Sequence, residues 1–237
     1  MGTSLPELLS SLVGIFQGAP EVVASNVIGS NIANICLVVG TAAIMSSKIL
    51  RVMYYLISGD LPLFVGSAFL FALMALSDRT FTRGESLILV LGYVVYLFYI
   101  LKSSNEEAQG QAGATDSPPA GAARSLREVP ILVLSGIFIF IGANYTIESL
   151  IQISDRLNIG RDVIAISAVA LGTSLPELIV TINAALKGKA ELAVGNVVGS
   201  NILNIFEVIG IHGLFKSLQD SEQILAYSVP TLLAASL

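Results

Sequence analysis

Charged residues are scarce in this chain of 237 residues: only 12% are Asp, Glu, Lys or Arg, whereas 54% are hydrophobic. The mean hydropathy of +0.81 is too high for an ordinary soluble domain. The formal net charge of -5 provides no basic patch of the kind that nucleic-acid binding requires. The composition therefore indicates a protein whose main partner is a lipid bilayer, and it argues against a nucleic-acid partner.

Cysteine and histidine occur once each. Cys36 alone cannot form an intramolecular disulfide. His212 alone excludes the His-pair zinc motifs and argues against a Ser-His or Cys-His catalytic arrangement. We therefore expect no enzyme activity and no resident cofactor.

Long apolar segments recur at about the twenty residues that a helix needs to cross the hydrocarbon core. They are nearly continuous rather than alternating, which favours helices over a barrel. No basic region precedes the first segment, so no cleavable signal peptide is predicted. We expect an all-α membrane bundle of about eight visible transmembrane segments. Their predicted ranges are 3–17, 22–46, 60–77, 84–102, 130–153, 162–186, 190–212 and 223–237.

The chain contains an internal repeat at a constant offset of 170 residues. Comparing residues 2–40 with 172–210 gives GTSLPEL twice and NVIGSNIANI beside NVVGSNILNI, with 19 of 39 positions identical. The two motif segments are five predicted crossings apart, an odd number, so the copies face opposite ways. This arrangement is an inverted repeat.

A polar stretch rich in Ala, Gly, Ser and Pro divides the chain. We expect residues 1–102 to form the first repeat, 103–128 a flexible linker and 129–237 the second repeat. The alternative is a long loop with no organising role. Seven Lys and Arg residues fall on the linker side and five on the other, which favours a cytoplasmic linker.

Each GTSLPEL motif places a serine three residues before a glutamate, the spacing of a helix-capping box, with a proline suited to the first helical turn. An apolar run precedes the second copy, so the pattern predicts a helix broken near mid-membrane. A carboxylate at the bilayer centre costs about 2.5 to 3.5 kcal/mol, and the motif holds no Lys or Arg. A bound cation would compensate Glu7 and Glu177. The alternative is that each glutamate is protonated or only caps its helix.

Polar side chains also recur at intervals of four after each motif, so that each set lines one helix face. They are Asn26, Ser30 and Asn34 in the first copy and Asn196, Ser200 and Asn204 in the second. Such hard oxygens suit Ca²⁺, which takes six to eight oxygen ligands, and argue against copper or zinc. The other role open to the GSN motif is close helix packing at Gly29 and Gly199, with its amides bonding across the interface, and we expect both roles together.

Glu207 has no counterpart, since Leu37 occupies the equivalent position. Its carboxyl group could be a peripheral proton or cation site, or a satisfied side chain.

With these motifs the chain resembles the cation/calcium exchanger superfamily, and within it the microbial sodium/calcium exchangers. The resemblance covers residues 2–40 and 172–210. It implies ten helices in two inverted halves, and alternating access in which Na⁺ moving down its gradient drives Ca²⁺ out through the same site. It also implies a multi-pass protein of the plasma (inner) membrane of a prokaryote.

Carried over position by position, the resemblance implies ion ligands in both copies. They are Thr3, Ser4, Glu7, Ser30 and Asn34, then Ala170 through its carbonyl, Thr173, Ser174, Glu177, Ser200 and Asn204. Several relatives, including the potassium-dependent branch, have Asp where this chain has Asn204. That difference argues against potassium dependence.

The resemblance further implies that the chain is truncated at both termini, because family members have a helix before the first motif and a tenth helix at the end. A fragment that does not transport is therefore one alternative. Exchange of Ca²⁺ for H⁺ at the same site is a second. An intramembrane hydrolase that uses the two glutamates as acid and base is a third, although the lack of HExxH argues against it.

Overall fold

The computed structural model describes residues 4–46, 56–77, 80–111, 122–215, 218–219 and 222–237. In the first half the helices are α1 (Leu5–Phe16), α2 (Glu21–Ala33), α3 (Gly40–Met45), α4 (Leu61–Ser77) and α5 (Arg83–Gln111). In the second half they are α6 (Ala122–Leu157), α7 (Arg161–Ile164), α8 (Ala170–Thr173), α9 (Leu175–Leu186), α10 (Ala190–Leu203), α11 (Gly210–Phe215) and α12 (Glu222–Ser236). Four π-helical segments connect or precede them: η2 (Asn34–Val39), η3 (Leu56–Asp60), η4 (Ala165–Val169) and η5 (Asn204–Ile209).

All eight predicted apolar segments contain helix. Among the described residues, five helices are long and apolar enough to span a membrane, and a sixth span results if α7–α8 and α9 are counted as one. With 12 and 15 residues, α1 and α12 are too short to cross about 30 Å of hydrocarbon alone. The structure therefore confirms an all-α membrane bundle.

Helices extend into the predicted linker, residues 103–128, from both sides. Helix α5 continues to Gln111 and α6 begins at Ala122, beyond the apolar segments that end at 102 and start at 130. Residues 112–121 lie outside the described residues. The division into repeats at 1–102 and 129–237 stays a prediction.

The second motif interrupts its helix as predicted. Residues Arg161–Thr173 and Leu175–Leu186 are inclined to each other by 41° at Ser174. Proline occupies the first turn of both α1 and α9, where its missing N–H breaks no helical hydrogen bond. Both helices then end at a glycine with positive φ, 77° at Gly18 and 70° at Gly188, a conformation that suits glycine.

The two copies repeat an unusual backbone feature as well as a sequence. The π-helical segments η2 and η5 begin at Asn34 and Asn204, which are equivalent positions, and both are followed by glycine. A π-helical turn carries an extra residue and is often found at functional sites. The two copies therefore have the same backbone conformation at the end of their polar rows.

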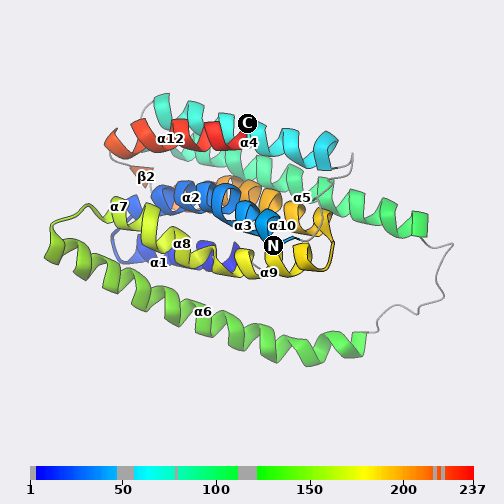
Figure 1. Cartoon of the computed structure of the whole chain (residues 1–237). Coiled ribbons are helices and arrows are strands. Elements are labelled where there is room, and N and C mark those ends of the chain that lie inside the picture. The colour runs from blue at the N-terminus through cyan, green and yellow to red at the C-terminus, as the bar shows by residue number, and fades with distance from the viewer. Residues whose placement is uncertain (1–3, 47–55, 78–79, 112–121, 216–217, 220–221) are drawn as a thin grey trace.

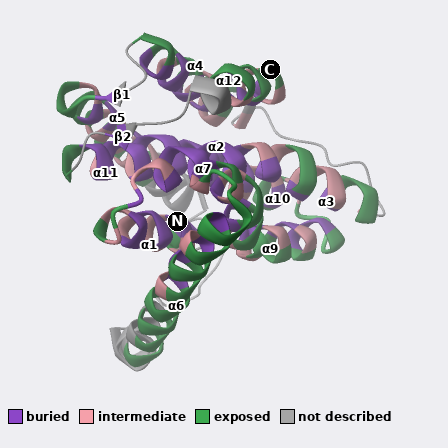
Figure 2. Cartoon of the chain, turned by 90° about the vertical axis from the view of Figure 1, so that its left-hand side faces the viewer, coloured by how far each residue is buried: buried purple, intermediate pink, exposed green. Residues whose placement is uncertain are grey.

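The helices α2 and α10 run through the middle of the bundle (Figure 1). Helices α4 and α12 lie on one side of them, and α1 and α9 lie on the other (Figures 1 and 2). Helix α6 packs against α1 and α7 and otherwise projects from the bundle (Figure 2). A two-residue antiparallel ladder, β1 (Thr80–Phe81) with β2 (Leu218–Gln219), ties the turn before α5 to the turn before α12.

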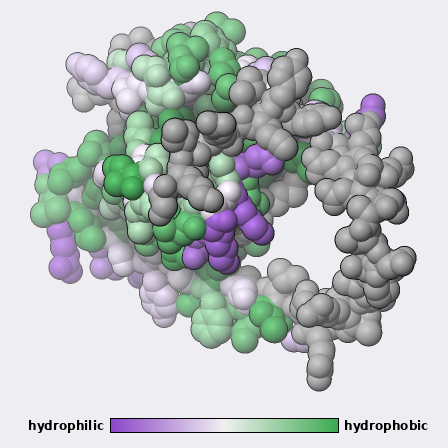
Figure 3. Space-filling model, turned by 45° about the vertical axis from the view of Figure 1, so that its right-hand side comes forward, coloured by the Kyte–Doolittle hydropathy of each residue, from purple (hydrophilic) through white to green (hydrophobic). Residues whose placement is uncertain are grey.

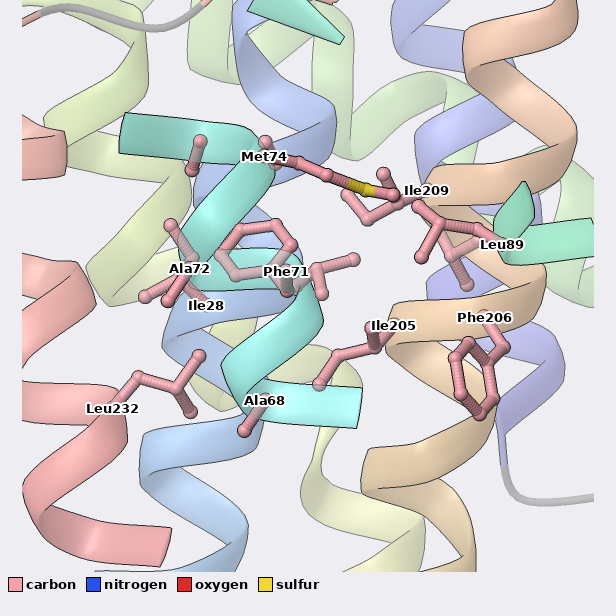
Figure 4. Close-up of a cluster of buried hydrophobic side chains, with 14 of the residues drawn as sticks. Ile28, Ala68, Phe71, Ala72, Met74, Leu89, Ile205, Phe206, Ile209 and Leu232 are labelled. Atoms are coloured by element: carbon pink, nitrogen blue, oxygen red, sulfur yellow. The ribbon is translucent and has the colours of Figure 1, made fainter. Parts of the chain in front are cut away.

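The larger apolar core joins both halves of the chain. Ile28 of α2, Phe71 of α4, Leu89 of α5, Ile205 of η5 and Leu232 of α12 meet in it (Figure 4). A second cluster joins α1, α2, α6 and η4. Apolar residues also cover much of the outer surface (Figure 3), as expected where the solvent is lipid.

Gly29 permits the closest helix contact in the bundle's centre. A Cβ atom at this position would lie 2.2 Å from the carbonyl oxygen of Ile166 and 2.6 Å from Cβ of Ala170. Because backbone forms the nearest contact, neither partner can move away without shifting a helix. The packing of α2 against η4 and α8 therefore depends on glycine, as small-residue helix contacts in membranes do.

We predict that Gly29→Ala lowers the unfolding free energy by roughly 1 to 3 kcal/mol, the usual cost of overpacking. Gly40→Ala is the matched control, because a Cβ there meets nothing within 4 Å. Thermal unfolding of the detergent-solubilised protein compares the two, and equal midpoints would contradict the close contact.

Candidate ion site

The two motif glutamates lie in the first turns of two short helices, Glu7 in α1 and Glu177 in α9. Both side chains have no exposed surface. The preceding serines, Ser4 and Ser174, are each 3% exposed. Both copies of GTSLPEL therefore direct their polar groups into the protein rather than toward its surface.

The prediction that the motif serines cap their helices is wrong. Neither Ser4 nor Ser174 makes a side-chain capping hydrogen bond, and neither hydroxyl oxygen has a partner among the described residues. A true capping box lies elsewhere, at Thr82 and Glu85: the Thr82 hydroxyl accepts from the Glu85 amide at 3.3 Å, and Glu85 Oε2 accepts from the Thr82 amide at 2.8 Å. That pair is exposed, and its two residues satisfy each other's hydrogen-bonding groups.

The two motif carboxyl groups differ in their hydrogen bonds. Neither oxygen of the Glu7 carboxyl group accepts a hydrogen bond of normal geometry from the described residues. Glu177 Oε1 accepts from the Ser200 hydroxyl at 3.3 Å. Arg161 forms salt bridges with Glu21 at 3.8 Å and with Asp155 at 3.3 Å.

Side chains of one copy contact the motif of the other. The Ser30 hydroxyl lies 3.2 Å from the Thr173 hydroxyl and 3.5 Å from the carbonyl oxygen of Ala170. The Thr173 hydroxyl lies 3.5 Å from Asn26 Oδ1. The broken helix of the second copy is therefore held against the polar face of α2.

The carbonyl of Ala170 is a protein acceptor in this structure. It accepts from the Ser174 amide at 3.1 Å and from the Thr173 hydroxyl at 3.2 Å, besides its contact with Ser30. A cation at this oxygen would compete with these donors. Thr3, the remaining predicted ligand, lies outside the described residues.

Asn34 and Asn204 belong to a network of four asparagines at the crossing of α2 and α10. Asn34 Nδ2 donates to Asn201 Oδ1 at 2.9 Å, and Asn204 Nδ2 donates to Asn31 Oδ1 at 3.1 Å. Asn31 and Asn201 each donate to the other's backbone carbonyl, at 3.2 and 3.3 Å. All four side chains are fully buried. The 170-residue offset relates Asn31 to Asn201 and Asn34 to Asn204, so the two hydrogen-bonded pairs are equivalent in the two copies.

Asn31 and Asn201 were not among the predicted site residues, but the expected bonding of the motif's amides across the helix interface is confirmed. Both were visible in the GSN motif, identical in the two copies. They stand one residue after the serine of the row spaced by four, so a single helix face did not include them. Only the crossing of two helices brings them against Asn34 and Asn204.

Glu207 is half-buried and accepts a hydrogen bond from the Tyr93 hydroxyl at 3.3 Å. This favours the satisfied side chain over a free ion group. His212 is fully buried, and its Nδ1 lies 2.6 Å from the Val208 carbonyl one turn earlier in the same helix. Neither of these hydrogen bonds involves Glu7 or Glu177.

The oxygen types in the cluster limit the ions that it can hold. Among the described residues, no group of three or more His, Cys, Asp or Glu comes together. A cation bound here would therefore have two carboxyl groups and complete its shell with hydroxyl, amide and carbonyl oxygens. Such ligands suit alkali and alkaline-earth ions rather than zinc or copper.

The two equivalent helix faces differ in what covers them. At Gly29 and Ser30 the face of α2 packs against η4 and α8. At Gly199 and Ser200 the face of α10 instead lines a cavity of about 300 Å³. Asp60, Tyr96 and Ile100 form other parts of its wall. The two sequence motifs are nearly identical, but the surroundings of the two helix faces differ in the described part of the chain.

The family model described as "Sodium/calcium exchanger protein" matches residues 1–102 and 128–237, nearly the whole chain on both sides of the polar stretch. The chain belongs to the sodium/calcium exchanger family. It is 34% identical to the sodium/calcium exchanger MaX1 of Methanosarcina acetivorans over an alignment of 274 residues that covers all of this chain and 77% of the relative. It is also 30% identical to the inner membrane protein YrbG of Escherichia coli, covering 90% of this chain and 66% of YrbG.

Solved structures of the sodium-calcium exchanger NCX_Mj, soaked with different amounts of Na⁺, Ca²⁺ or Sr²⁺, show the same fold. One of them aligns with a TM-score of 0.68 and 29% identity, covering all of this chain and 74% of that one. Together with the membrane-length helices, these relatives show that the chain is a multi-pass integral membrane transporter and not an enzyme.

We predict that Ser174→Ala does not lower the unfolding free energy, because no capping hydrogen bond is lost and a buried hydroxyl without a partner among the described residues is removed. Thr82→Ala should cost about 1 kcal/mol, because it removes a true cap. Thermal unfolding of both variants checks the contrast. A larger loss in the Ser174 variant than in the Thr82 variant would restore the capping role.

Proposed function

We propose that this protein exchanges Na⁺ for Ca²⁺ across a membrane, by alternating access at one site between the two GTSLPEL motifs. The proposed ligands are Glu7 and Glu177, completed by Thr3, Ser4, Ser30, Asn34, Ala170, Thr173, Ser174, Ser200 and Asn204. Na⁺ and Ca²⁺ are its substrates. The proposed location is the plasma membrane of a prokaryote, with the polar stretch on the cytoplasmic side.

One observation carries this proposal: Glu7 and Glu177, the equivalent acids of the two motifs, are both fully buried in the bundle. Two negative charges taken from water need compensation, and a divalent cation supplies it without a third charged side chain. The amide oxygens of Asn34 and Asn204 and the hydroxyls of Ser4 and Ser174 add acceptors with no partner in the described residues. A buried acceptor without a partner costs about 1 to 3 kcal/mol, which an ion ligated there would recover.

Charge also suggests how the fluxes are coupled. Two carboxylates neutralise one Ca²⁺, and monovalent Na⁺ ions binding the same oxygens can replace it. Binding of either ion removes the uncompensated charge and permits the occupied site to change its access. An empty site carries two buried negative charges, which opposes its movement through the bilayer. Exchange rather than uniport follows from this difference.

The mechanism needs no chemistry from the protein beyond ligation. Hydroxyl and amide oxygens come from both copies, so one ion contacts both halves of the bundle at once. Two contacts support this: the Ser30 hydroxyl lies 3.2 Å from the Thr173 hydroxyl of the second motif, and the Ser200 hydroxyl donates to Glu177 at 3.3 Å. Relative movement of the two copies would then alter which side of the membrane reaches the site.

We predict that Glu177→Gln reduces sodium-gradient-driven ⁴⁵Ca²⁺ uptake into vesicles by about a hundredfold or more. An ion pair at 4 Å is worth about 4 kcal/mol at an effective dielectric constant of 20. Glu148→Gln is the control, because Glu148 is an exposed acid of α6. Undiminished uptake by the Glu177 variant would refute the site.

Exchange of Ca²⁺ for H⁺ at the same carboxyl groups is the second candidate, because protons can also neutralise Glu7 and Glu177. We expect ⁴⁵Ca²⁺ uptake to follow an imposed sodium gradient at constant pH. Uptake that follows a pH gradient in sodium-free vesicles, with no response to sodium, would assign the function to the proton exchanger instead.

A further inference from the structure

The network of Asn31, Asn34, Asn201 and Asn204 has a direction that the backbone dictates. Asn201 Nδ2 donates to the carbonyl oxygen of Asn31, a group that can only accept. The Asn201 amide must therefore face Asn31 with its nitrogen and present its Oδ1 elsewhere. That oxygen meets the Asn34 side chain at 2.9 Å, so Asn34 is obliged to donate through Nδ2.

The same reasoning holds for the other pair. Asn31 Nδ2 donates to the carbonyl oxygen of Asn201, which leaves Asn31 Oδ1 to accept from Asn204 Nδ2 at 3.1 Å. Both Asn34 and Asn204 thus use their amide nitrogens within the network. Their Oδ1 atoms are buried and have no hydrogen-bond partner among the described residues.

A carboxamide that can turn over offers a cation its nitrogen as readily as its oxygen, and only the oxygen is a ligand. The network removes this freedom at both positions. Asn34 and Asn204 are also the first residues of π-helical segments, where a local change of backbone pitch sets the side-chain direction. Burial of all four side chains keeps water from competing for the hydrogen bonds.

We propose that Asn31 and Asn201 are positioning residues for the cation site: each fixes the carboxamide of the opposite copy so that Asn204 and Asn34 present oxygen to the ion. This inference rests on the proposed function and deepens it. The role asks no ligation of Asn31 or Asn201, because the amide nitrogen and oxygen of both already have partners within the network. The pairing crosses between the copies, Asn201 with Asn34 and Asn31 with Asn204.

The crossing gives the role a signature in double-mutant cycles. Leucine is close to asparagine in size and removes the amide. Asn201→Leu releases the Asn34 amide, so the apparent Ca²⁺ affinity should fall on the order of tenfold. In an Asn34→Leu background the oxygen is already gone, and Asn201→Leu should have little further effect on affinity. In an Asn204→Leu background the two losses should multiply.

The mirror cycle tests the same rule in the other copy. Asn31→Leu should lose its effect on affinity in the Asn204→Leu background and keep it in the Asn34→Leu background. Hydrogen-bonded residues also couple in stability, so a merely structural role predicts crossed coupling in thermal unfolding without crossed coupling in Ca²⁺ affinity. The readout is therefore the pattern of coupling and not the size of any single loss.

Affinity is measured by equilibrium ⁴⁵Ca²⁺ binding to the purified full chain in lipid nanodiscs, with thermal unfolding recorded for each variant. Asn183→Leu is the matched control, because Asn183 is exposed and donates only to the Ile179 carbonyl of its own helix. It should leave the affinity unchanged. Independent, multiplicative losses for Asn201 with Asn34 would overturn the positioning role, as would unchanged affinity in Asn201→Leu.

Glu177→Gln separates this inference from the proposed function. Ca²⁺ binding that depends on Glu177, together with multiplicative asparagine losses, would overturn the positioning role and leave the exchange site intact. Ca²⁺ binding that ignores Glu177→Gln, together with crossed coupling of the asparagines, would refute the glutamate site and retain the amide positioning.

Discussion

The constraint on which the rest of this bundle depends is the complete burial of two carboxyl groups, those of Glu7 and Glu177. Glu7 and Glu177 cannot be satisfied by helix capping, because their carboxyl groups lie inside the protein and not at an exposed helix start. The neighbouring groups are hydroxyls, amides and carbonyls, which stabilise a cation but do not replace one. The short helices α1 and α9, the proline at each start and the polar rows of α2 and α10 all serve to bring these oxygens together.

The inverted repeat lets one small motif supply both sides of the site. Each copy gives one glutamate at a helix start and one polar row on the following helix. The contacts then run between copies, as Ser30 with Thr173 and Asn34 with Asn201 show. Since a twofold arrangement places equivalent groups opposite each other, each asparagine can complete the partner that its own helix cannot reach. Gly29 permits the contact of Ser30 with Thr173 by leaving room for the backbone of η4.

The same spacing of serine or threonine and glutamate has two outcomes in this chain. At Thr82 and Glu85 it forms a reciprocal capping box on the surface, where both side chains gain partners. In the GTSLPEL motifs the serines make no such bond, and their buried hydroxyls have no partner among the described residues. The local spacing is identical in both cases, so the spacing alone does not decide whether a capping box forms.

The amino-acid sequence by itself determined the membrane class, the all-helical bundle, the duplication and the family, because these depend on composition, periodicity and motifs within short stretches. The break at Ser174 also followed from a proline in a first turn. Tertiary structure alone decided that the motif serines do not cap, that Tyr93 satisfies Glu207, and that Asn31 and Asn201 orient Asn204 and Asn34. Those contacts join residues on different helices, up to 173 positions apart. A hydrogen bond depends on where two helices cross, which no single helical pattern encodes.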